Sequence, residues 1–215
     1  MSLYEVNIYP NGKSPKLFKN RFFEKLTKTH PLVILVMYFI LGFFLLRYYH
    51  IYVNISWGNL LGLFMLGLLS WTLAEYLMHR FLYHRIGDAS FSSGIHYVFH
   101  GIHHEYPNDE DRLILPPVPS LIIASVFFLI FYLLMADKAF AFAPGFLIGY
   151  VLYMMVHYTI HKVPMPKKFN FWWKHHNIHH FQQHDRAFGV STPLWDYVFR
   201  TMPEKNRKTV KIIKL

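Results

Sequence analysis

The residues of this sequence that could do chemistry are histidines, gathered in four short clusters. Thirteen of the fifteen histidines lie between His79 and His184. On a helix, residues three and four apart share a face, so most of these imidazoles could be aimed at common points. Because imidazole binds iron, zinc, copper and nickel, the spacing indicates a metal centre. The clusters are HRFLYH (His79, His84), HYVFHGIHH (His96, His100, His103, His104), HYTIH (His157, His161) and HHNIHH (His175, His176, His179, His180).

The number of histidines indicates two metal ions rather than one. Ten imidazoles exceed what a single ion accepts, whereas five for each of two ions leave an open position where dioxygen could bind. Spacing does not decide two further residues: His96 shares a face with His100, and His175 shares one with His179.

Other polar residues near the clusters have different expected roles. His30 and His50 flank an apolar stretch and are interpreted as interfacial residues, and His184 as a surface residue or one that orients a ligand. Glu75, four residues before His79, is the best candidate for a carboxylate that orients a ligating imidazole, because a carboxylate at membrane depth is costly. Loop ion pairs or helix caps are expected for Asp109, Glu110, Asp111 and Asp196.

The elements that must position the histidines are apolar. The chain is 53% hydrophobic and 19% aromatic, which is typical of a membrane protein. It has no cysteine, which excludes thiolate-bound zinc, iron–sulfur clusters and a cysteine nucleophile. Four stretches have the length of membrane-spanning helices and predict two helical hairpins in an all-α integral membrane protein. They are Pro31–Tyr49, Trp57–Leu77, Leu121–Met135 and Ala139–Val156, with Pro144 and Gly145 placed to kink or delay the fourth.

The basic residues predict the orientation in the membrane. Of the 22 Lys and Arg residues, six lie between Lys13 and Lys28 and eleven between Lys162 and Lys214. By the positive-inside rule both termini and the 78–120 loop are cytosolic, so the histidines form a helical cap on the cytosolic face. Such basic ends indicate contact with anionic lipid and argue against nucleic-acid binding. The length predicts a single domain, residues 1–215, with a cytosolic lead-in (1–30) and a basic tail (203–215) that frays.

Five segments in unbroken order resemble the fatty acid 2-hydroxylase branch of the membrane fatty acid hydroxylase and sterol desaturase superfamily. They are EYLMHRFLYH, HYVFHGIHHEYPNDEDRLILPPVPS, GYVLYMMVHYTIHKVPMP, KHHNIHHF and FGVSTPLWDYVF. The histidine groups are shared by the whole superfamily, whereas the RLILPPVPS and FGVSTPLWDYVF runs are peculiar to the branch. The resemblance implies that the metal ligands are His79, His84, His100, His103, His104, His157, His161, His176, His179 and His180.

The resemblance also implies the reaction and its cofactors. The expected enzyme is a di-iron monooxygenase that hydroxylates carbon 2 of a fatty acyl chain, either a free fatty acid, a thioester or a sphingolipid N-acyl chain, using O2 and two electrons. Zinc could replace iron in isolated protein, because it binds nitrogen donors more tightly than ferrous iron. Many eukaryotic members carry a fused b-type cytochrome domain, whose His-Pro-Gly-Gly motif is not found here. A separate electron donor is therefore expected: a b-type cytochrome, a ferredoxin or a reductase. The enzyme itself is expected in a bacterial inner membrane or, in a eukaryote, in the endoplasmic reticulum.

Rival interpretations stay open at this point. The same oxidant could serve a sterol oxidase, a carotenoid hydroxylase or a desaturase. A histidine-rich metal transporter would place its ligands along a path inside the spans, and a haem electron carrier needs only two axial histidines for each haem. A purely structural membrane protein gives no reason for the histidine spacings.

Overall fold

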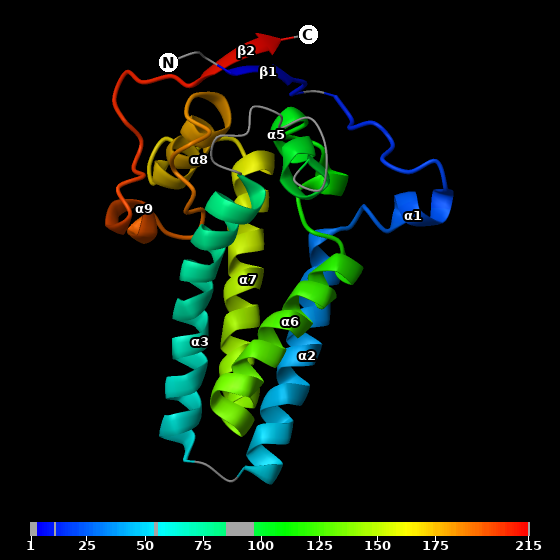
Figure 1. Cartoon of the computed structure of the whole chain (residues 1–215), viewed down its shortest axis with the longest axis vertical. Coiled ribbons are helices and arrows are strands. Elements are labelled where there is room, and N and C mark those ends of the chain that lie inside the picture. Colours follow the sequence, from blue (N-terminus) through cyan, green and yellow to red (C-terminus); the bar gives the residue numbers. More distant parts are fainter. Residues whose placement is uncertain (1–3, 11, 54–55, 85–96, 215) are drawn as a thin grey trace.

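Long apolar helices carry a cap of shorter elements at one end (Figure 1). The structure, a computed structural model, describes residues 4–10, 12–53, 56–84 and 97–214. The long helices are α2 (Pro31–Tyr52), α3 (Trp57–Leu77), α6 (Pro117–Met135) and α7 (Ala139–Lys162). The shorter helices are α1 (Arg21–Lys25), α5 (Ile102–Glu105), α8 (Phe171–Phe181) and α9 (Leu194–Val198). Two π-helical segments, η1 (Met78–Tyr83) and η2 (Tyr97–Gly101), and two 3-10 turns, η3 (Glu110–Arg112) and η4 (Ala136–Lys138), complete the helical elements of the described residues.

The described residues contain three helical stretches that are long and apolar enough to cross a membrane. They are Pro31–Tyr52, Trp57–Tyr83 and Glu110–Lys162, the last of which holds both α6 and α7. Large apolar side chains on the outside of these helices are exposed, for example Phe43 and Leu133, as expected of surfaces that face lipid. The chain is therefore an integral membrane protein, and the finer expectation of four separate spans stays a prediction.

The helix boundaries follow local signals. Helix α3 has the predicted bounds, and the Ser56 hydroxyl accepts a hydrogen bond from the Asn59 amide at its start. Helix α6 begins at Pro117, a residue whose fixed φ suits the first helical turn. Helix α7 already begins at Ala139, so Pro144 does not delay it, and it continues to Lys162, beyond the predicted end. The longer α7 carries two histidines of the third cluster into the cap.

Helix α7 is the centre of the bundle, and glycines let it approach α3 closely. It packs against α2, α3 and α6. A methyl group on Gly67 of α3 would overlap the backbone carbonyl of Phe142, and one on Gly145 of α7 would overlap that of Phe64. Small residues at such positions let helix backbones pack tightly where lipid supplies no hydrophobic driving force.

We expect the substitution Gly67→Ala to destabilise the bundle, because the added methyl must push the α3 and α7 backbones apart. The cost should be about 1–3 kcal/mol, as for other overpacked cores. Thermal unfolding in detergent measures it. Gly62→Ala is the matched control on the same helix, because nothing lies within 4 Å of a methyl at that position. Equal stability of the two variants would contradict the close approach of α3 and α7.

Two short strands, which were not predicted, join the ends of the chain. Strand β1 (Tyr4–Ile8) pairs in parallel with β2 (Val210–Lys214), so the C-terminal segment is paired rather than frayed. Figure 1 shows the pair beyond α5 and α8, at the end of the molecule opposite the last turn of α2 and the first turn of α3. After β1, the backbone amide of Tyr9 donates to the carbonyl of Glu105, which fastens the N-terminal segment to the cap. Apart from this small sheet, the regular secondary structure of the described residues is helical.

Candidate metal centre

The ten histidines that the resemblance implies as ligands come together in two groups of five. In each group the nearest ring nitrogens all lie within 4.8 Å of one another, and nine of the ten side chains are buried. Group one is His79, His84, His100, His104 and His179, and group two is His103, His157, His161, His176 and His180. Each group could hold one metal ion, and their assignment as ligands stays a proposal.

The spacing of the ring nitrogens fits ligands of a common ion. The Nε2 atoms of His100 and His104 lie 2.9 Å apart, those of His84 and His179 3.0 Å, and those of His161 and His176 2.9 Å. With metal–imidazole bonds of about 2.0–2.1 Å, two ligands at a right angle are about 3 Å apart. In the described residues, both ring nitrogens of His180 are buried without a hydrogen-bond partner, which is costly unless something else binds them.

Helical geometry sends neighbouring histidines to different groups. On an α-helix, two residues four positions apart differ by only about 40° around the axis, whereas two adjacent residues differ by about 100°. His100 and His104 accordingly belong to group one, and His103 belongs to group two. In α8, His176 and His180 likewise join group two while His179 joins group one. The three imidazoles of a triplet are therefore not all aimed at one point, and each triplet serves both groups.

A π-helical turn explains the first cluster, whose spacing of five does not suit an α-helix. Segment η1 continues α3, and the amide of His84 donates to the carbonyl of His79 at 3.0 Å. This i→i+5 bond places the two residues one above the other, so both imidazoles reach group one. The spacing of His79 and His84 was therefore a signal of the π turn itself.

The imidazoles of the cap are held in the neutral form that binds metals. Burial lowers the pKa of His100, His103 and His104 well below its ordinary value, and nearby imidazoles lower it further. The same causes lower the pKa of the three α8 histidines, His176, His179 and His180. A metal ion therefore need not displace protons from these rings at neutral pH.

Backbone carbonyls orient two of the group-one rings. The Nδ1–H of His79 donates to the Phe188 carbonyl at 2.5 Å, and the Nδ1–H of His179 donates to the Arg186 carbonyl at 2.7 Å. Each bond fixes the tautomer, so that Nε2 carries the lone pair toward the other histidines. The 186–191 segment thus acts as a fixed frame for group one.

Two buried carboxylates hold this frame in place. Glu75 accepts from the amides of Val190 (2.6 Å) and Ser191 (2.8 Å) and also bonds the Ser191 hydroxyl. It therefore binds the segment whose Phe188 carbonyl orients His79, instead of touching an imidazole as the sequence suggested. Its role is indirect, because a backbone loop lies between the carboxylate and the ring.

Asp196, for which only a loop or capping role was expected, supports the same segment from the other side. It is fully buried and accepts from the amides of Phe188 (2.9 Å) and Gly189 (2.8 Å) and from the Thr201 hydroxyl (2.7 Å). The Nε2–H of His175 donates to it at 3.0 Å. A single aspartate in a short helix such as α9 carries no sequence signal for this role.

The other histidines of the described residues lie outside both groups. His175, one of the two residues that spacing left undecided, donates to Asp196 and belongs to neither group. His96, the other, falls outside the described residues. His184 is buried and its Nε2–H donates to the His180 carbonyl at 2.8 Å, consistent with an orienting role. His30 caps α2, and His50 packs against Trp57 with ring centroids 5.0 Å apart. Among the acidic loop residues, Asp111 pairs with Lys28 and Glu110 with Lys162, as expected.

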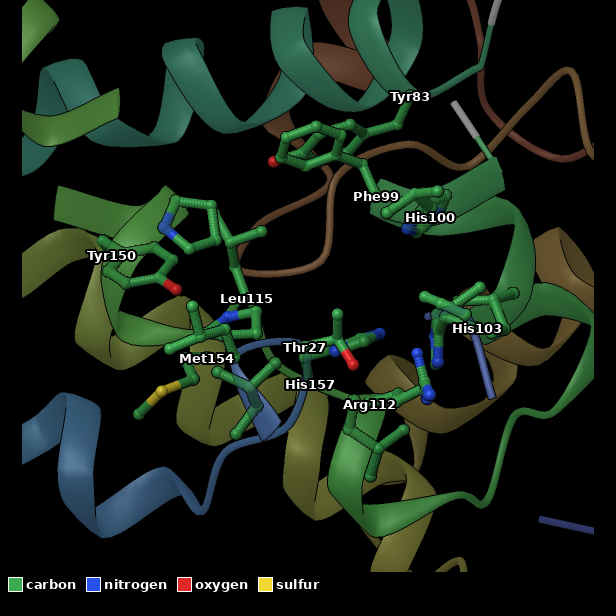
Figure 2. A pocket seen from close by; sticks show the side chains of 18 of the residues that line it. Thr27, Tyr83, Phe99, His100, His103, Arg112, Leu115, Tyr150, Met154 and His157 are labelled. Atoms are coloured by element: carbon green, nitrogen blue, oxygen red, sulfur yellow. The ribbon is translucent and has the colours of Figure 1, made fainter. Parts of the chain in front are cut away.

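An apolar cavity of about 270 Å³ adjoins both histidine groups. His100 of group one and His103 and His157 of group two are part of its lining (Figure 2). The other walls are mostly apolar side chains of η2, the 113–119 segment and α7, and of the N-terminal segment, including Phe18 and Phe23. Residues 1–30 were predicted only as a cytosolic lead-in, so their contribution to the cavity wall was not predicted. The cavity can seat an apolar chain beside the histidines.

Comparisons with known proteins agree with this site. A family model described as fatty acid hydroxylase matches residues 64–201. A fatty acid 2-hydroxylase of Rattus norvegicus is 45% identical over 154 residues, covering 67% of this chain and 41% of the relative. A dihydroceramide fatty acyl 2-hydroxylase of Arabidopsis thaliana is 34% identical over 197 residues, covering 89% of this chain and 81% of the relative.

A yeast relative and a solved structure extend the match over most of the chain. A ceramide very long chain fatty acid hydroxylase of Saccharomyces cerevisiae is 36% identical over 200 residues, covering 90% of this chain and 50% of the relative. A structure titled "Full length scs7p (only hydroxylase domain visible)" superposes with a TM-score of 0.79 at 33% identity, covering 94% of this chain and 76% of that one. The chain spans about two fifths of the length of the rat relative. By the family match and these relatives, the chain belongs to the fatty acid hydroxylase family.

Proposed function

We propose that this protein is a membrane di-iron monooxygenase that hydroxylates carbon 2 of a fatty acyl chain. One atom of O2 enters the C–H bond, and the other leaves as water with two protons and two electrons from a separate donor protein, a b-type cytochrome, a ferredoxin or a reductase. The observation that carries the proposal is the apolar cavity that adjoins both groups of five histidines. The named activities of the rat, Arabidopsis and yeast relatives support it.

The histidines would hold two iron ions, one in each group, which supply the oxidising power that an unactivated C–H bond requires. Three of the imidazoles that would hold the ions, those of His100, His103 and His157, also line the cavity. The carbonyls of Phe188 and Arg186 keep two Nε2 atoms of group one aimed inward. The apolar walls exclude water and hold the acyl chain at a fixed depth, so position rather than acid–base chemistry selects the carbon. Zinc would fit the same nitrogen donors.

The membrane arrangement of the proposal is four spans with the cap on the cytosolic side. Helices α6 and α7 would each cross the membrane and turn at η4. The concentration of basic residues at both ends of the chain supports this orientation. The gathering of both histidine groups at one end of the bundle favours an oxygenase over a metal transporter, which would need ligands along a path.

Lipid mass spectrometry of a host expressing the protein under 18O2 tests the function. The expected result is new 2-hydroxyacyl chains that each carry one 18O atom. The host without the gene, grown under the same gas, is the control. New double bonds, oxidised sterols or hydroxylated carotenoids, without 2-hydroxyacyl chains, would replace the proposal with one of its rivals.

A further inference from the structure

One polar group in the cavity is not explained by the histidine groups. Arg112, at the end of η3, lines the same cavity as His103 and His157 (Figure 2). Its side chain is only 3% exposed. Among the described residues of the lining, it is the one Lys or Arg side chain. A guanidinium inside a largely apolar cavity needs a reason, because burying a charge is costly.

Two of the five N–H donors of this guanidinium are already bonded. Its Nη2 donates to Glu24 Oε1 at 2.6 Å and to the Pro15 carbonyl at 3.2 Å. Within the described part of the chain, its Nε and Nη1 are buried and have no hydrogen-bond partner. Arginine carries five N–H donors in a planar fork, so three of them are left over here. Buried donors of this kind are rarely left unpaired, which indicates that a ligand atom binds them.

The charge of the site limits what that ligand atom can be. The Glu24 carboxylate pairs with Arg112 and also accepts from the amides of Leu17 (2.9 Å) and Phe18 (3.1 Å). The ion pair is neutral overall, so a second carboxylate would meet the negative charge of Glu24. An uncharged carbonyl oxygen needs only the spare N–H donors. The site therefore suits an acyl group in amide or ester linkage better than a free fatty acid.

We propose that Arg112 is a positioning residue that binds the carbonyl oxygen of the substrate's acyl group and thereby selects carbon 2. This inference rests on the proposed function. Carbon 2 is bonded directly to the carbonyl carbon, so the carbonyl anchor and the histidines must line one cavity, as Arg112, His103 and His157 do. Holding the carbonyl fixes which methylene faces the oxidant.

Ligand binding tests the inference without relying on turnover. The probes are a long-chain N-acyl amide, the alkyl ether of equal length, which lacks the carbonyl, and the free fatty acid, each titrated into the metal-loaded protein in nanodiscs. The wild type is expected to bind the amide about tenfold or more tightly than the ether, as for a hydrogen bond to a charged donor, and also more tightly than the free acid. Equal affinity of the wild type for amide and ether would overturn the proposal.

The informative variant is Arg112→Lys, which keeps the ion pair with Glu24 but loses the planar fork. This variant is expected to bind the amide and the ether with affinities that differ by less than about twofold. Hydroxylation should spread from carbon 2 to carbon 3, while metal content is unchanged. A variant that loses total product but keeps the wild-type binding preference and position of hydroxylation would show a merely structural role and overturn the inference.

Lys28→Gln is the matched control. It breaks another ion pair between the N-terminal segment and η3, with Asp111, but Lys28 does not line the cavity. It should keep the wild-type preference and regiochemistry, and a change equal to that of Arg112→Lys would contradict a specific role for Arg112. If the wild type prefers the amide but makes no 2-hydroxyacyl lipid, the proposed function fails and the carbonyl site stands.

Discussion

Replacing His179 with alanine is expected to lower 2-hydroxylation by well over a hundredfold while the protein still inserts into the membrane. Loss of a residue that merely orients a metal ligand costs about 10–100-fold, so loss of a ligand should cost more. His179 contributes a ring to group one, and its imidazole lies in the cap rather than in the bundle that faces lipid. Product analysis by mass spectrometry, with the amount of membrane-inserted protein measured in parallel, gives the result.

Variants in both groups sharpen this experiment. His100→Ala in group one and His180→Ala in group two should each abolish activity, because the proposed reaction needs an ion in both groups. The matched control is His50→Ala, which removes an imidazole that packs on Trp57 at the α2–α3 turn. It should keep its activity. Full hydroxylation by any of the three cluster variants would remove that histidine from the proposed ligand set.

Removal of the metals is expected to lower the unfolding temperature by about 10 °C or more. Each ion bound at a thousand times its Kd contributes about 4 kcal/mol, and a chain of this size shifts by about 2–4 °C per kcal/mol. Without ions, the ring nitrogens of His103 and His180 are buried with nothing to bind in the described residues. Unfolding of chelator-treated protein in detergent measures the shift. Fe²⁺ or Zn²⁺ should reverse it and Mg²⁺, which prefers oxygen ligands, should not.

The metal-free protein should also be sensitive to acid. Burial lowers the pKa of His100, His176 and His179 in the folded state, whereas the unfolded chain takes up protons below about pH 6.5. The unfolded state therefore binds more protons, and the free energy of unfolding falls as the pH is lowered below about 6.5. Their stabilising contribution is fully present above that pH. Stability that stays constant from about pH 7.5 to 5 would contradict the neutral, buried state of these imidazoles.

The sequence predicts most of what is local and little of what depends on contacts between distant segments. The bounds of α3 were predictable because an apolar run with an N-cap serine specifies a helix by itself. The ten histidines were identified by family resemblance, and helical spacing showed why they recur. Five histidines for each of two ions were expected, but the membership of the two groups was not predicted, because His103 joins His157 across the cap rather than its neighbours His100 and His104.

Contacts between distant segments account for the features that were missed. Strands β1 and β2 are five residues each and lie at opposite ends of the chain, so no local pattern reports their pairing. Glu75 was expected to touch an imidazole, but the loop at Val190 and Ser191 lies between, and nothing in the sequence places that loop there. The unpaired donors of Arg112 likewise become visible only when Glu24, from the N-terminal segment, takes part of its guanidinium.

The central claim is that two ions lie side by side, each held by five imidazoles. An anomalous difference map from crystals of the purified protein, recorded at the absorption edge of its bound metal, tests it most directly. We expect two peaks for each chain, one among His79, His84, His100, His104 and His179 and the other among His103, His157, His161, His176 and His180. A single peak, or peaks outside these groups, would contradict the account.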